Sequence, residues 1–104
     1  MRFKSIDCIQ AEELMSAAAV EIIDVRDKEA FDAGHIKGAK QMAVSQLHEF
    51  CQTNTKDTVV LVYCYHGISS QSVAQYLVDQ GMENVHSLTG GYEVWKEQHR
   101  TAGD

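Results

Sequence analysis

The sequence predicts an α/β fold with a mainly parallel central sheet and helices on both faces, and three observations support this. Short apolar runs alternate with helix-forming segments along the chain, which is typical of strands crossed by helices. The run TVVLVY at Thr58–Tyr63 is continuously apolar and β-branched, as expected for a central strand covered on both faces. The length of 104 residues fits a single domain, which we place at residues 1–104.

In the first half of the chain, strand and helix signals follow one another from the N-terminus. Arg2–Ile6 has the character of a short strand, and Ala11–Ala19, rich in Ala, Glu, Leu and Met, predicts a helix. The β-branched run VEIIDV at Val20–Val25 predicts a buried strand. Lys28–Ala33 predicts a short helix that Gly34 ends.

The second half repeats this alternation around the TVVLVY strand. Ala39–Met42 predicts a small strand and Val44–Phe50 a helix. Ser70–Asp79 carries apolar residues at helical spacing and is followed closely by a glycine, so we expect a helix there. Val85–Leu88 predicts a last strand, and Tyr92–His99 a last helix.

Charge and cysteine content exclude several classes of partner. A net charge of −6 argues against nucleic acids and against anionic membrane surfaces as partners. No stretch approaches the ~20 apolar residues of a membrane span, and no apolar secretory segment follows the N-terminus. Cys8, Cys51 and Cys64 are widely spaced and form no C-x-x-C pair, so neither a disulfide framework nor a zinc site is expected. These features favour a reducing, cytoplasmic location.

The stretch VYCYHGISS places Cys64 where the strongest strand ends and a short loop leads into a helix. Ligands of parallel sheets gather at this end of the strands. Loop amides and the helix N-terminus would together lower the pKa of a thiol below its free value of ~8.5, leaving a nucleophilic thiolate. Gly67 would give the loop its tight backbone, and Ser69 or Ser70 would cap the helix and supply a hydroxyl. A small core cysteine is the alternative, but a core residue needs no such loop.

A phosphatase is the sharpest competing enzyme, because such enzymes also hold a cysteine between a strand and a helix. Their signature resembles His-Cys-x5-Arg, in which arginine grips the phosphate. Here Tyr63 precedes the cysteine and Ser70 stands six positions after it. A phosphate or arsenate enzyme is therefore not expected.

Three ordered motifs resemble those of the rhodanese family. VEIIDVRDKEAFDAGHIKG at Val20–Gly38 resembles the first family signature, and GGYEVW at Gly90–Trp95 resembles the second. Between them, CYHGIS resembles the active loop of a single-domain rhodanese, and the whole is most similar to small bacterial thiosulfate sulfurtransferases. The resemblance covers nearly the whole chain and implies a rhodanese-like domain.

The resemblance implies a double-displacement reaction without metal or organic cofactor. The Cys64 thiolate would take the outer sulfur of thiosulfate as a persulfide and pass it to cyanide or to a cellular thiol, such as thioredoxin or another dithiol. Backbone amides of the loop would hold the anionic sulfur. The residues that supply them are Tyr65, His66, Gly67, Ile68, Ser69 and Ser70.

Two charged residues at the end of Val20–Val25 are expected to support the loop. Asp24 and Arg26 must find partners at a buried strand end, and the family places this region near the active loop. His66 is expected to point outward, and His35 to bond a neighbouring loop. Tyr92 and Trp95 are expected to pack the last helix on the sheet.

One departure from the family keeps a second function open. Many members carry arginine at the position of Ser69, whereas no lysine or arginine occurs from Cys64 to Ser70. A sulfur-relay module that takes persulfide from a partner protein, and turns over free thiosulfate poorly, is therefore the alternative.

Overall fold

A computed structural model describes residues 2–99 of the chain. Their strands form one five-stranded sheet in the order β1-β5-β4-β2-β3, and every neighbouring pair is parallel. The strands are β1 (Lys4–Ile6), β2 (Val20–Asp24), β3 (Lys40–Gln41), β4 (Val59–Tyr63) and β5 (Asn84–Leu88). The helices are α1 (Cys8–Ala17), α2 (Lys28–Ala33), α3 (Val44–Thr53), α4 (Ser69–Asp79) and α5 (Gly91–Gln98).

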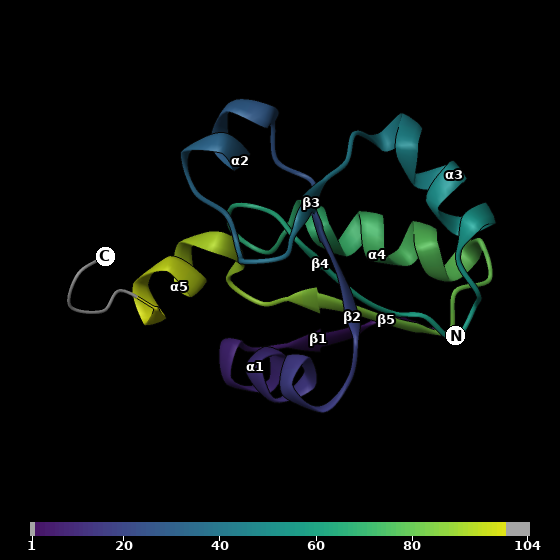
Figure 1. The fold of residues 1–104 in the computed structure, drawn as a ribbon, viewed down its shortest axis with the longest axis horizontal. Coiled ribbons are helices and arrows are strands. Elements are labelled where there is room, and N and C mark those ends of the chain that lie inside the picture. Colours follow the sequence, from purple (N-terminus) through teal and green to yellow (C-terminus); the bar gives the residue numbers. More distant parts are fainter. Residues whose placement is uncertain (1, 100–104) are drawn as a thin grey trace.

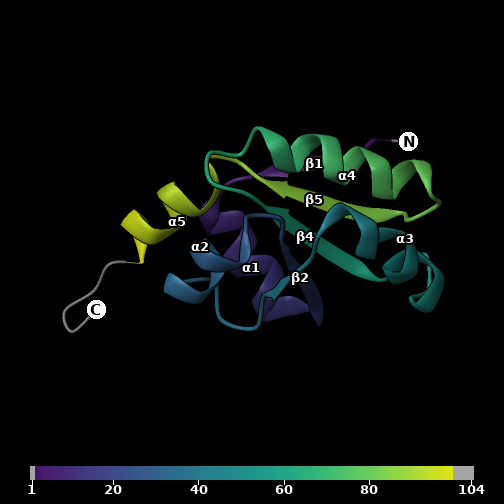
Figure 2. The same cartoon turned by 90° about the horizontal axis from the view of Figure 1, so that it is seen from above.

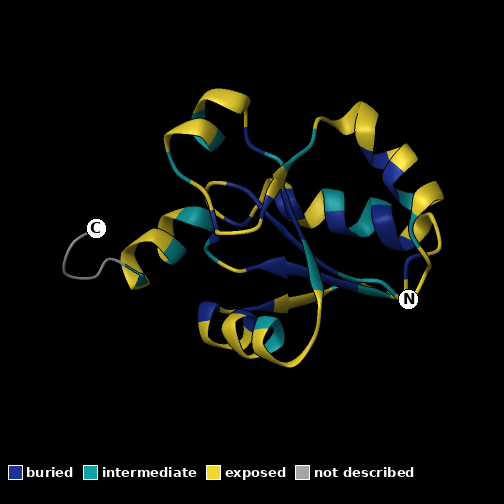
Figure 3. Ribbon diagram, viewed as in Figure 1, coloured by how far each residue is buried: buried dark blue, intermediate teal, exposed yellow. Residues whose placement is uncertain are grey.

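The sheet is covered on both faces, as the sequence predicts (Figure 1). α3 and α4 pack on one face through Leu47, Phe50, Ala74 and Leu77. On the other face, α1 and the segments around α2 and α5 form a second core. β4 contributes to both cores and is fully buried over Val60–Tyr63 (Figure 3). The continuous apolar run of β4 is thus explained by two hydrophobic layers meeting at one strand.

The sheet register brings the ends of two strands together. Asp24 of β2 pairs with Tyr63 of β4, and the Val25 amide donates to the Tyr63 carbonyl at 3.1 Å. The residues that follow these strands therefore emerge side by side at one edge. α2, α5 and the loop between β4 and α4 all lie at this end of the sheet in both views (Figures 1 and 2).

The predicted elements are all present, and their ends differ by a few residues. The largest difference is in α1, which begins at Cys8 rather than Ala11 and ends at Ala17. Asp7 and Gln10 form a reciprocal capping box, in which the Gln10 amide donates to the Asp7 carboxylate at 2.8 Å. This cap starts the helix before the Ala-rich segment. Among residues 2–99, no helix has the length and apolar character needed to cross a membrane.

Candidate active site

Cys64 lies at the carboxyl end of β4, directly before the loop that enters α4. Its thiol is almost enclosed, with 5% of the residue exposed. Two backbone amides donate to its sulfur: the N–H groups of Gly67 and Ser70 each lie 3.2 Å from Sγ. The Ser70 amide belongs to the first turn of α4, where backbone N–H groups have no partner within the helix. Two of the six loop amides named from the sequence therefore converge on the sulfur.

The pKa of the Cys64 thiol is set by two opposing effects. Burial alone would raise this pKa, because it disfavours the charged thiolate. The Ser70 hydroxyl, the two donating amides and the nearby His66 amide favour the thiolate, and together their effect on the pKa outweighs that of burial. The net result is a pKa below the ordinary value for cysteine, and hence a larger thiolate fraction near neutral pH.

The Ser70 hydroxyl is itself held by a second buried serine. Its Oγ lies 2.9 Å from Oγ of Ser87, on β5. Because Ser70 gives its proton to Cys64, we assign Ser87 as the donor to Ser70. Both serines are buried, so the chain Ser87–Ser70–Cys64 is shielded from water. The sequence predicts that Ser69 or Ser70 offers a hydroxyl to Cys64, and in the structure Ser70 provides it. The contribution of Ser87 is not predicted from the sequence.

The predicted capping role of Ser69 or Ser70 is wrong. The residue preceding α4 is Ile68, and no side chain caps this helix. The sulfur of Cys64 takes the place of a capping oxygen, because it accepts the Ser70 amide that a cap would otherwise satisfy.

α5 fixes the loop from outside through its own first turn. The Tyr92 amide donates to the Cys64 carbonyl at 2.7 Å, and the Glu93 amide donates to the Tyr65 carbonyl at 3.1 Å. The backbone at Gly91 lies so close that an added Cβ would stand 2.5 Å from the Cys64 carbonyl oxygen. Gly67 has a φ of 82°, a left-handed conformation that glycine adopts without strain. The glycine pair Gly90-Gly91 at the start of α5 thus allows the helix to approach the backbone of the active loop closely.

Asp24 and Arg26 form a buried ion pair beside the loop. Arg26 Nη2 lies 2.7 Å from Asp24 Oδ2, and the same nitrogen donates to the Gly34 carbonyl at 2.6 Å. The Tyr63 hydroxyl also bonds to Asp24 and accepts the Ile36 amide at 3.2 Å. Burial and this bond to Asp24 raise the pKa of Tyr63, so its hydroxyl stays neutral. Tyr63, which directly precedes Cys64, is thereby hydrogen-bonded both to Asp24 at the end of β2 and to the segment that contains Ile36.

Arg26 also contacts the aromatic residues around the loop. Its guanidinium carbon lies 4.2 Å from the Tyr92 ring centroid and 5.4 Å from that of Tyr65. Guanidinium groups are attracted to aromatic faces at such distances. Arg26 thus contacts one aromatic side chain of the loop and one of α5 while it is paired with Asp24.

The thiol opens into a shallow cleft of about 450 Å³. The cleft is lined by Val25, Arg26, Asp27, Cys64, Tyr65, His66, Ile68 and Ser69. Tyr65 and Ile68 are exposed at its mouth, Ile68 by 73%. An apolar rim above a thiolate excludes water from part of the reaction path and strengthens the hydrogen bonds beneath it.

The remaining predicted residues lie away from the sulfur. The His66 side chain points outward, as expected, and its Nδ1 lies 2.8 Å from Oε2 of Glu93. Tyr92 and Trp95 pack against the second core, also as expected. His35 does not bond a neighbouring loop: its Nδ1 contacts the Phe31 carbonyl of α2 at 2.8 Å. Within residues 2–99, no three metal-ligating side chains form a group that could hold an ion.

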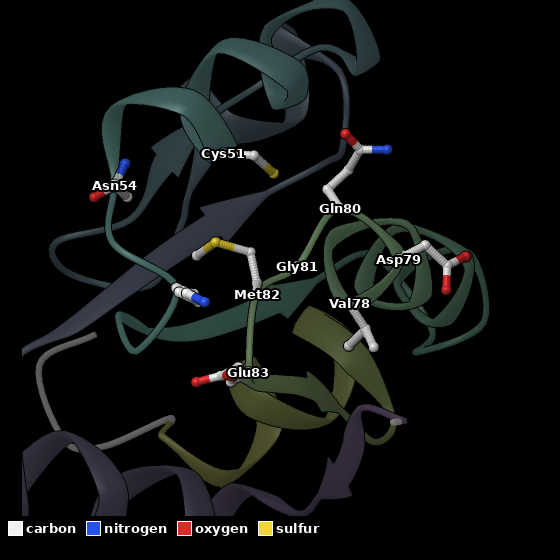
Figure 4. Close-up of a pocket in the computed structure, with 9 residues that line it drawn as sticks. Cys51, Asn54, Val78, Asp79, Gln80, Gly81, Met82 and Glu83 are labelled. Atoms are coloured by element: carbon white, nitrogen blue, oxygen red, sulfur yellow. The ribbon is translucent and has the colours of Figure 1, made fainter.

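Cys51 lines a different cleft, shown in Figure 4. This cleft is at the opposite end of the sheet from Cys64. This cleft is larger, about 620 Å³, and its walls come from the ends of α3 and α4 and the turn before β5. Burial raises the pKa of Cys51, and burial together with Asp7 and Glu12 raises that of Cys8. The hydrogen-bond donors that lower the pKa of Cys64 have no counterpart among the causes that act on these two thiols.

Comparisons with known proteins agree with this geometry. Residues 8–98 match the family model described as the rhodanese-like domain. The thiosulfate sulfurtransferase GlpE of Coxiella burnetii is 46% identical over 102 residues, covering 98% of this chain and 95% of that protein. GlpE of Pseudomonas putida is 45% identical over 94 residues, covering 90% and 86%. The crystal structure of a rhodanese-related protein from Thermoplasma volcanium superposes with a TM-score of 0.78 at 26% identity, covering 93% and 94%.

Proposed function

The chain belongs to the rhodanese family, and on that premise we propose how it acts as a thiosulfate sulfurtransferase with Cys64 as its nucleophile. The activity follows from full-length similarity to enzymes of that name in several bacteria. The observation that carries the mechanism is the set of donors around the Cys64 sulfur, which favour its thiolate. Because Ser69 stands where many family members carry arginine, these donors must stabilise the anion without a cation in the loop itself.

In the first half-reaction, the Cys64 thiolate attacks the outer sulfur of thiosulfate. A sulfur–sulfur bond forms to Cys64, the bond to the sulfonate sulfur breaks, and sulfite leaves with that electron pair. The product is an anionic Cys64 persulfide. The amides of Tyr65, His66, Gly67, Ile68, Ser69 and Ser70 are the groups available to hold its terminal sulfur. Their directions are fixed by the loop before substrate arrives, so little reorganisation is needed.

In the second half-reaction, an acceptor removes the terminal sulfur. Cyanide leaves as thiocyanate, and a thiol leaves as its own persulfide. In each case the sulfur–sulfur bond breaks and its electrons return to Cys64 as the thiolate. Ping-pong kinetics are expected, because the donor product leaves before the acceptor reacts. We propose a dithiol such as thioredoxin as one cellular acceptor.

The three cysteines support a reducing compartment for this cycle. All three thiols are free, and a persulfide carrier must return to the thiolate after every turnover. Disulfides persist mainly in oxidising compartments. We therefore place the protein in the cytoplasm.

Intact mass measurement tests the proposal directly. The reduced protein is weighed before and after thiosulfate, and then again after cyanide. We expect the gain of one sulfur atom, reversed by cyanide, in the wild type and in Cys51→Ser. Cys64→Ser should gain none and should lose turnover by on the order of 10³-fold or more.

The same experiment separates the enzyme from the relay module. A wild-type protein that gains no sulfur from thiosulfate, but gains it from a persulfidated protein, would replace the sulfurtransferase with the relay function. Sulfur gained by Cys64→Ser would contradict the assignment of the nucleophile.

A further inference from the structure

Hydrogen-bond donors outside the active loop hold several of its carbonyl groups. The Tyr92 amide donates to the Cys64 carbonyl at 2.7 Å, and the Glu93 amide donates to the Tyr65 carbonyl at 3.1 Å. Both donors belong to the first turn of α5. A peptide unit is planar and trans, so its N–H points to the side opposite its C=O. Each bond to a loop carbonyl therefore also fixes the direction of the N–H in the same peptide unit.

The side chain of Gln71, in the first turn of α4, holds a further carbonyl of the loop. Its Nε2 donates to the Gly67 carbonyl at 2.8 Å, while its backbone amide donates to the Ile68 carbonyl at 3.1 Å. In a regular α-helix this backbone amide would bond the carbonyl four residues earlier, which is that of Gly67. The φ of Gly67 is 82°, far from the helical value of about −63°. The Gln71 side chain thus makes a bond that the backbone of α4 does not make.

The amide in the Gly67–Ile68 peptide unit has no role in holding the free thiol. It belongs to Ile68, which is not among the donors that act on the Cys64 sulfur. Within residues 2–99, no backbone carbonyl accepts this amide. Ile68 lines the Cys64 cleft, whereas Gln71 lies outside the lining of that cleft. A Gly67 carbonyl held by Gln71 directs the Ile68 amide away from Gln71.

We propose that Gln71 is a positioning residue for sulfur transfer, because its bond to the Gly67 carbonyl turns the Ile68 amide toward the terminal sulfur of the Cys64 persulfide. This inference rests on the proposed function and adds the residue that sets one of its donors. Persulfide formation places negative charge on the terminal sulfur, and an amide already aimed at this atom stabilises the charge without reorganisation. The free thiolate is held by other groups, namely the Gly67 amide and the amide and hydroxyl of Ser70. Gln71 therefore acts on the persulfide and not on the thiol.

The variant Gln71→Met tests this role, because methionine is uncharged, similar in length and similar in helix propensity to glutamine, but has no donor. Gln75→Met is the matched control. Gln75 lies one turn further along α4, and its Nε2 donates to the Asp79 carboxylate at 2.9 Å, at the far end of the helix from the loop. Each protein is loaded with persulfide by inorganic polysulfide. Alkylation of Cys64 by iodoacetamide is then followed against pH, for the persulfide and for the free thiol, by peptide mass spectrometry.

Gln71→Met should change the persulfide and leave the thiol as it is. We expect the alkylation midpoint of the persulfide to rise by about half a pH unit to one pH unit, because its anion loses an aimed donor. The midpoint of the free thiol should be the same as in the wild type. Persulfide formation from thiosulfate should slow by about threefold to tenfold for the same reason. Gln75→Met should match the wild type in all three measurements.

The outcomes separate this inference from the function on which it rests. A wild type that gains no sulfur from thiosulfate would reject the sulfurtransferase, and the polysulfide-loaded proteins would still test Gln71. An unchanged persulfide midpoint in Gln71→Met would refute the positioning role. Equal shifts of the persulfide and thiol midpoints would also overturn it, because Gln71 would then only maintain the loop. The same holds if Gln75→Met shifts the persulfide midpoint as much as Gln71→Met.

Discussion

Each end of the sheet holds a partly enclosed cysteine, but hydrogen bonds favour the thiolate form of only one of these two cysteines. Cys64, at the carboxyl ends of the strands, accepts two amide N–H groups and has a lowered pKa. Cys51, at the opposite end, lies in the larger cleft, and burial raises its pKa. Desolvation acts on both sulfurs in the same direction. The two thiols differ in the number of hydrogen-bond donors that the surrounding backbone and side chains direct at the sulfur.

This difference shows that neither cavity size nor burial identifies the reactive thiol. The donors at Cys64 come from a helix N-terminus and a tight loop, whereas the turns around Cys51 follow helix C-terminal ends. Helix N-termini present N–H groups and the C-termini present carbonyls. A thiolate is thus stabilised at one end of a parallel α/β sheet and disfavoured at the other.

The largest effect is expected from alanine at a glycine that shapes the active loop. Gly91 and Gly81 lie at opposite ends of the sheet and both have positive φ, 64° and 105°. An added Cβ at Gly91 would clash with the Cys64 carbonyl oxygen at 2.5 Å, whereas at Gly81 it would meet nothing within 4 Å. Gly81→Ala should lower the free energy of unfolding by ~1–2 kcal/mol through backbone strain. Gly91→Ala should cost more than this and should also abolish persulfide formation.

Urea denaturation and intact mass after thiosulfate measure these two effects separately. If Gly91→Ala keeps normal persulfide formation, the contact between α5 and the loop does not position the sulfur. If Gly81→Ala loses it, the two ends of the sheet are not independent.

The pH dependence of alkylation should separate the two thiols next. Only the thiolate reacts, so each alkylation rate rises with pH and levels off above the pKa of that thiol. Because hydrogen bonds lower the pKa of Cys64 and burial raises that of Cys51, the alkylation midpoint of Cys64 should lie at a lower pH than that of Cys51. Iodoacetamide labelling of the folded protein, quantified by peptide mass spectrometry, measures both midpoints in one sample. Coincident midpoints would show that the donors do not act on Cys64.

The Ser70 hydroxyl accounts for part of that difference. Ser70→Ala removes the side-chain donor to Cys64 and keeps the backbone amide. A hydrogen bond to a charged group contributes ~1.5–3 kcal/mol, so the midpoint should rise by about one to two pH units and persulfide formation at pH 7 should slow by roughly tenfold or more. Ser69→Ala is the matched control. Its hydroxyl is not among the donors to Cys64, so a change of at most about twofold is expected. Equal effects in the two variants would remove Ser70 from the donor set.

Most of the fold, and the position of Cys64 at the end of a central strand, could be predicted from the sequence, because both depend on local patterns. The apolar run before Cys64 indicated a central strand, and the loop composition after it indicated a set of amides. The start of α1 was missed although its Asp7–Gln10 spacing is a capping signal. The Ala-rich composition of the following segment indicates a favourable helix interior but not where the helix begins.

The supporting residues could not be predicted, because they depend on which strands become neighbours. Ser87 reaches Ser70 only after β5 has paired beside β4. Tyr63 was recognised as a strand residue, but its bonds to Asp24 and Ile36 require the register between β2 and β4. A single sequence contains neither fact. Serine on a buried strand is the one available signal for Ser87, since a buried hydroxyl needs a partner.

The smallest effect on the pKa of Cys64 is expected from a change at Ser87, which contacts the Ser70 hydroxyl rather than the sulfur itself. Ser87→Ala should leave the Ser70 hydroxyl without its donor and should raise the alkylation midpoint of Cys64 by a few tenths of a pH unit, slowing persulfide formation at pH 7 about twofold to threefold. The double variant Ser70→Ala/Ser87→Ala gives the decisive comparison. If Ser87 acts through Ser70, the double variant should match Ser70→Ala alone, because residues in one hydrogen-bond chain are not additive. Additive effects would mean that Ser87 influences Cys64 by packing. The hydrogen-bond chain that acts on the sulfur would then not extend beyond Ser70.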